Sequence, residues 1–156
     1  MGDNPNFKKF VERLGASHKG VQHAAKWLEG RGYQVSIPPT TVADSYENRM
    51  AHVDNGDLFI ERLRIEVKTL GVTFTGRADW PFKSKFMVCG KDSFDRADPK
   101  PFAYLIQSKD LKFMGVVLSA SSKYWYVENK LDKDYPEEYR QDFYMCPMEH
   151  VRFCSI

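Results

Sequence analysis

One stretch decides the fold of this chain: residues 55–68, with the sequence NGDLFIERLRIEVK. If Glu61 and Arg62 form a two-residue turn, Ile60 faces Leu63 and Asp57 faces Glu66. Side chains alternate between the two faces of a strand. One face of this hairpin is then wholly apolar (Leu58, Ile60, Leu63, Ile65 and Val67), and the other carries Asp57, Phe59, Arg64, Glu66 and Lys68. Glu-Arg is not a favoured pair for a tight turn, so a longer turn is the alternative.

The charged face of this hairpin has the composition of a metal site. Directly opposite residues have Cβ atoms about 5 Å apart, so Asp57 and Glu66 would repel each other unless a cation lay between them. Mg²⁺ binds such oxygen ligands and usually takes one or two carboxylates. Lys68 shares the face and could hold a scissile phosphate or help to deprotonate a metal-bound water. The alternative is a solvated strand face with alternating charges.

The same residues resemble a known family. Asp57, followed after a short apolar strand by Glu66-Val67-Lys68, resembles the D-(x)n-E-x-K signature of the PD-(D/E)xK nuclease superfamily. That superfamily includes type II restriction enzymes, archaeal Holliday-junction resolvases and many phage and repair nucleases. Residues 28–35 (LEGRGYQV) resemble the helix, turn and strand that precede the motif in resolvase-like members. The resemblance covers residues 19–70, which is less than half of the chain.

The resemblance implies a restriction-endonuclease-like αβββαβ core, with a central mixed sheet flanked by helices. It also implies that Asp57, Glu66 and the carbonyl of Val67 bind Mg²⁺, with Mn²⁺ as a substitute, and that Lys68 is catalytic. Two departures stand out. Gly56 replaces the usual proline, and the helix position where many members have a glutamate offers Gln22 or His23, of which we choose Gln22 as the catalytic helper. The sequence after Lys68 does not follow a resolvase pattern.

The rest of the chain predicts one α/β nuclease domain over residues 1–156, without repeats or linkers. Apolar spacing predicts helices at 6–14 and 19–30, the first ending at Gly15 and the second capped by Ser17. We expect strands at 33–37, 58–60, 63–67, 86–89, 102–107 and 113–118, weaker ones at 124–127 and 143–146, and a last short helix at 148–153. Residues 40–55 are expected to form a loop.

Nucleic acid is the partner that the charge pattern favours, although the net charge is only +2. Basic residues outnumber acidic ones between Arg62 and Lys100, which ordinary surface variation would also produce. The candidate phosphate contacts are Arg64, Arg77, Lys83 and Lys85. Trp80-Pro81-Phe82 could stack on bases or could plug the sheet as an aromatic cover, and both interpretations stay open.

The expected function is that of a Mg²⁺-dependent DNA endonuclease. The alternative is a non-catalytic module that binds nucleic acid or protein on the same fold, and DNA is not distinguished from RNA. Apolar runs are too short to span a membrane, the N-terminus lacks the apolar stretch of a signal peptide, and three cysteines in no framework spacing suit a reducing cytosol. We therefore expect a cytoplasmic protein of a bacterial, archaeal or phage-infected cell. Many superfamily members dimerise to cut both strands, which makes a homodimer a candidate assembly.

Overall fold

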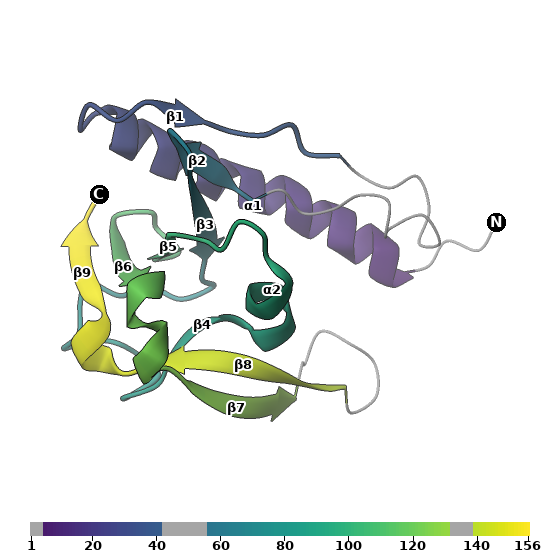
Figure 1. Ribbon diagram of the computed structural model, residues 1–156, viewed down its shortest axis with the longest axis vertical. Coiled ribbons are helices and arrows are strands. Elements are labelled where there is room, and N and C mark those ends of the chain that lie inside the picture. Colours follow the sequence, from purple (N-terminus) through teal and green to yellow (C-terminus); the bar gives the residue numbers. More distant parts are fainter. Residues whose placement is uncertain (1–4, 42–55, 132–138) are drawn as a thin grey trace.

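Two β-sheets and one long helix make up the structure, a computed structural model that describes residues 5–41, 56–131 and 139–156 (Figure 1). The helices are α1 (Pro5–Glu29), α2 (Lys91–Arg96) and the 3₁₀ helices η2 (Ser119–Tyr124) and η3 (Met148–His150). The strands are β1 (Val35–Ser36), β2 (Leu58–Ile60), β3 (Leu63–Thr69), β4 (Phe86–Gly90), β5 (Ala103–Gln107), β6 (Phe113–Leu118), β7 (Tyr126–Leu131), β8 (Arg140–Cys146) and β9 (Arg152–Ser155). The fold is therefore mixed α/β.

The larger sheet is mixed, as the sequence predicts. Its six strands have the order β1-β2-β3-β5-β6-β9, and the smaller sheet has the order β4-β8-β7. β3 and β5 are parallel, with Ile65 beside Ala103 and Lys68 beside Ile106, whereas the other pairs of neighbours are antiparallel. Parallel neighbours need a long connection. Here residues 70–102 supply it and contain both β4 and α2.

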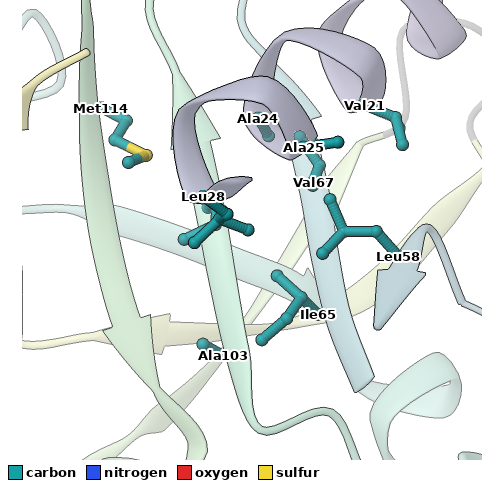
Figure 2. Close-up of a cluster of buried hydrophobic side chains, with 10 residues drawn as sticks. Val21, Ala24, Ala25, Leu28, Leu58, Ile65, Val67, Ala103 and Met114 are labelled. Carbon is teal, nitrogen blue, oxygen red and sulfur yellow. The ribbon is translucent and has the colours of Figure 1, made fainter. Parts of the chain in front are cut away.

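Helix α1 covers one face of the larger sheet. Its buried side chains are Val21, Ala24, Ala25 and Leu28, and they pack against Leu58, Ile65, Val67, Ala103, Leu105 and Met114 (Figure 2). Three of these partners belong to the face of the 55–68 hairpin that the sequence analysis predicts to be apolar. The two remaining side chains of that apolar face differ: Ile60 is partly buried against this core, while Leu63 is 44% exposed at the turn. Burial of this face fixes which side chains of β3 point away from the helix.

The prediction of two helices separated at Gly15 is wrong, because α1 runs without a break over 25 residues. A glycine inside a helix costs about 1 kcal/mol relative to alanine, which weakens a helix without ending it. Ser17 does not cap a second helix. Its hydroxyl donates to the carbonyl of Leu14 at 2.8 Å, within the same helix.

The opposite face of the larger sheet is covered by the smaller sheet (Figure 1). The core between the two sheets contains Phe86 and Val88 of β4, Tyr104 and Ile106 of β5, and Val117 of β6. The expectation of a sheet flanked by helices is therefore correct for one face only. Apart from α1, the described residues form only short helices, namely the six-residue α2 and the 3₁₀ helices η2 and η3.

Smaller differences also separate the structure from the sequence-based prediction. The strand expected at 33–37 contains only Val35–Ser36, and the helix expected at 148–153 is η3 followed by strand β9. Helix α2 was not predicted, and ion pairs between Lys91 and Asp95 and between Asp92 and Arg96 span one turn of it. The loop expected at 40–55 lies almost wholly outside the described residues. None of the described helices combines the length and apolarity needed to cross a membrane.

Candidate active site

The β2–β3 hairpin has the register predicted from the sequence. Ile60 pairs with Leu63, Phe59 with Arg64, and Leu58 with Ile65, so the turn consists of Glu61 and Arg62. Glu61 adopts a φ of 55°, the left-handed conformation that tight hairpin turns require and that glutamate rarely adopts. Extending this register by one residue would set Asp57 beside Glu66.

Asp57 is held in place by the backbone of the neighbouring strand. It directly precedes β2, and its Oδ2 accepts a hydrogen bond from the amide of Val67 at 2.6 Å. The preceding residue, Gly56, has a φ of 91°, which proline cannot adopt. A Cβ on Gly56 would lie 2.8 Å from Nε of Arg64, so glycine at this position is required both by the backbone and by the packing.

Glu66 is paired with the arginine two residues before it on the same strand face. Nε of Arg64 donates to Oε1 of Glu66 at 2.6 Å, and the two side chains are 8% and 17% exposed. Arg64, predicted as a phosphate contact, is therefore mostly buried and orients a carboxylate. A carboxylate can accept several hydrogen bonds or metal bonds at once, so this ion pair does not use the full capacity of Glu66.

These residues form one wall of a pocket with a volume of about 600 Å³, which we call the acidic pocket. Lys68 also lines it, and its Nζ lies 4.0 Å from Sδ of Met87 on β4. The facing residues come mainly from the long connection between β3 and β5. The described residues lining the acidic pocket are Asp57, Arg64, Glu66, Val67, Lys68, Val88, Cys89, Gly90, Asp92, Ser93, Arg96, Ala97, Pro101, Tyr104 and Phe143.

The facing wall of this pocket is not predicted from the sequence. Cys89 lies there beside Tyr104, and burial raises the pKa of the Cys89 thiol to about 11. Burial likewise raises the pKa of the Tyr104 hydroxyl. Both groups stay neutral near pH 7, so they supply polar contacts without charge. The spacing of the ion pairs in 91–96 was the available signal for a helix at this wall.

The donor set of the acidic pocket suits a hard divalent cation with few protein ligands. No cluster of three or more His, Cys, Asp or Glu side chains placed to hold a metal occurs in the part of the chain that the structure describes. Mg²⁺ commonly uses one or two carboxylates and keeps several waters, which matches Asp57 and Glu66. The side chain of Val67 is buried against α1, so its contribution to the pocket is its backbone.

The remaining predicted site residues lie elsewhere. Gln22 is exposed on α1, with its amide nitrogen 3.0 Å from Nε2 of His18, and it does not line the acidic pocket. Lys83 and Lys85 line a second pocket of about 370 Å³, which we call the lysine pocket. Arg77 is exposed and lines neither of the two. The structure thus brings together Asp57, Arg64, Glu66, Val67 and Lys68 in the acidic pocket. Lys83 and Lys85 share the lysine pocket with Lys68, whereas Gln22 and Arg77 line neither pocket.

Searches with the whole chain against protein-family models, curated proteins and solved structures found no match.

Proposed function

We propose that this protein is a Mg²⁺-dependent nuclease that hydrolyses phosphodiester bonds of DNA, with a restriction-endonuclease-like core. The observation that carries the proposal is the shared wall of the acidic pocket, where Asp57, Glu66 and Lys68 line one cavity and Val67 fixes Asp57 by a 2.6 Å hydrogen bond. The order α1, β1, β2, β3, α2 and β5 agrees with an αβββαβ core into which β4 is inserted.

Each residue of this wall has a role in such a reaction. Asp57 and Glu66 would hold the cation, which supplies Lewis-acid charge and lowers the pKa of water. The ammonium of Lys68 would bind a non-bridging phosphate oxygen and stabilise the negative charge that develops during attack on phosphorus. Arg64 would keep the carboxylate of Glu66 turned into the pocket through their ion pair.

The test is cleavage of labelled DNA by variants that change charge and little else. Asp57→Asn retains an oxygen to accept the Val67 amide but removes the negative charge, and Lys68→Ala removes the ammonium. We expect each to lower the cleavage rate by at least about 100-fold. Asp142→Asn and Lys109→Ala, at exposed positions outside both pockets, are the matched controls. Full activity of either Asp57→Asn or Lys68→Ala would contradict the proposal.

A second candidate is a binding module without catalysis, and one observation favours it. Nε of Arg64 lies 2.6 Å from Oε1 of Glu66, so the chain itself places a positive charge beside this carboxylate. If the protein is a binding module, it should bind nucleic acid or protein without cleaving a phosphodiester bond. A Mg²⁺ titration of the wild-type protein with single-stranded, duplex, branched and RNA substrates separates the two, because only a nuclease produces metal-dependent cleavage.

The cellular setting and assembly belong to the same proposal. Cys89, Cys146 and Cys154 are all free thiols, which supports a reducing, cytoplasmic location. Cleavage of both strands of a duplex would call for a homodimer, and sedimentation of the protein with and without DNA measures that assembly.

A further inference from the structure

The lysine pocket has a rigid aromatic floor. Trp80 is 7% exposed, its Nε1 donates to the carbonyl of Lys85 at 3.0 Å, and its ring stacks on Phe86 at 4.7 Å. Phe82 packs edge-on against Trp80 at 5.3 Å yet is 46% exposed. The sequence Trp80-Pro81-Phe82 could either cover the sheet or stack on bases. Trp80 is part of the aromatic cover, whereas the ring of Phe82 packs against Trp80 and remains accessible to solvent.

The lining of the lysine pocket is strongly basic. Lys68, Lys83, Lys85 and Lys130 all line it, and no acidic residue does so among those the structure describes. Glu128, outside the lining, accepts ion pairs from Lys85 at 3.0 Å and from Lys130 at 3.5 Å. One carboxylate against the ammonium groups of Lys83, Lys85 and Lys130 leaves an excess of positive charge beside the aromatic side chains of the pocket. A polyanion with flat apolar rings has the complementary chemistry.

The lysine pocket adjoins the acidic pocket through two elements. Lys68 lines both pockets, and its Nζ lies 4.0 Å from Sδ of Met87. Along β4, Met87 lines the lysine pocket and the next residue, Val88, lines the acidic pocket. A strand whose phosphate contacts Lys68 at the proposed cleavage site would therefore have its neighbouring nucleotide at the lysine pocket.

We infer that the lysine pocket binds an unpaired nucleotide beside the scissile phosphate, with its base on Phe82, so that the substrate is single-stranded or locally unpaired DNA. This inference rests on the proposed function, because the acidic pocket supplies the cleavage site. A base stacked inside a duplex has no open face for Phe82, whereas an unpaired base of any identity does. A volume of about 370 Å³ falls in the range of small-ligand sites and admits one nucleotide.

Binding in EDTA tests the inference without requiring metal or cleavage. The probes are fluorescein-labelled oligothymidylate, an abasic strand of the same length, and the blunt duplex of oligothymidylate with oligodeoxyadenylate, followed by fluorescence anisotropy. We expect tighter binding of oligothymidylate than of the abasic strand or the duplex. Phe82→Ala should weaken oligothymidylate binding about 5- to 150-fold, which is the effect of losing one base–aromatic stack.

Phe102→Ala is the matched control, because Phe102 is also 46% exposed and lines neither pocket. A second variant, Lys83→Ala, should make the plot of log affinity against log salt concentration less steep by about 0.7, which is the contribution of one phosphate contact on a single strand. Circular dichroism checks that each variant is folded.

The inference is overturned if Phe82→Ala binds oligothymidylate as tightly as the wild type does. It is also overturned if this variant loses as much affinity for the abasic strand as for oligothymidylate, or if the wild type binds the duplex more tightly than the single strand. It is likewise overturned if polyglutamate competes with oligothymidylate in a Phe82-dependent way, since the pocket would then recognise an acidic peptide. The proposed function fails separately, if Mg²⁺ supports no cleavage while Phe82-dependent binding of oligothymidylate persists.

Discussion

Replacing Arg64 by methionine should make the stability of this protein depend on divalent cations. The substitution keeps most of the side-chain volume but removes the guanidinium that donates to Glu66 at 2.6 Å. Both partners lie in the acidic pocket, where Asp57 adds a second carboxylate. Without Arg64, the mostly buried carboxylate of Glu66 loses this ion pair.

The expected loss follows from the burial of the pair. Breaking a buried ion pair by removing one partner costs about 3–5 kcal/mol, and the 17% exposure of Glu66 lowers the estimate to about 2–4 kcal/mol in EDTA. A cation bound to the folded protein at 100 times its dissociation constant restores about 2.7 kcal/mol. Mg²⁺ should therefore recover most of the stability of Arg64→Met, and should stabilise the wild type less, because Arg64 there competes for Glu66.

Urea unfolding followed by circular dichroism, in EDTA and in Mg²⁺, measures this difference. Lys91→Met is the matched control. Its ion pair with Asp95 is partly exposed, at 36% and 40%, and lies outside both pockets, so its removal should cause the same small change in EDTA and in Mg²⁺. If Arg64→Met loses the same free energy of unfolding with and without Mg²⁺, no cation binds at the two carboxylates, and the Arg64–Glu66 pair is structural.

Two further outcomes follow from the geometry of the acidic pocket. Gly56→Ala should destabilise the protein by about 2–4 kcal/mol, because the new Cβ would be strained at a φ of 91° and would lie 2.8 Å from Nε of Arg64. The control Gly32→Ala should cost only about 1 kcal/mol, because Gly32 has a similar φ of 87° but nothing within 4 Å of its Cβ position. Equal losses of the two variants in urea unfolding would mean that Arg64 moves aside freely. Alkylation of Cys89 by iodoacetamide at pH 8, followed by mass spectrometry, should be roughly 100-fold slower than that of an exposed cysteine, because burial raises the pKa of the Cys89 thiol to about 11. Rapid labelling at pH 8 would contradict the burial of this thiol. Because the pKa of Cys89 is raised from 9.0 to about 11 in the folded state, the stability that the neutral thiol contributes is present below pH 9 and is lost as the pH rises towards 11.

The hairpin could be predicted from the sequence because two constraints agree on it. Alternation places Leu58, Ile65 and Val67 on one face, and a one-residue shift would expose all of them to water. The buried α1 interface enforces that register, and the positions of Asp57 and Glu66 follow from it. The turn itself was the weak point, since Glu61 is an unusual residue for a φ of 55°.

The opposite wall of the acidic pocket could not be predicted in the same way. Residues 91–96 have no apolar face, and none of their side chains is buried, so hydrophobic periodicity carries no signal there. Only the charge spacing of Lys91 with Asp95 and of Asp92 with Arg96 indicated a helix. The smaller sheet was also missed as a unit, because pairing between β4 and β8 joins segments far apart in sequence.

The parallel pairing of β3 with β5 has a consequence for how this protein acquires its site during synthesis. The wall with Asp57, Glu66 and Lys68 needs only a two-residue turn to form, whereas the wall with Cys89 and Asp92 belongs to residues 70–102 and is fixed only when β5 docks beside β3. Closing so long a connection is slow and entropically costly. A nascent chain therefore displays the D-(x)n-E-x-K sequence well before it has the facing wall of the acidic pocket, and the complete cavity forms only after β5 has docked beside β3.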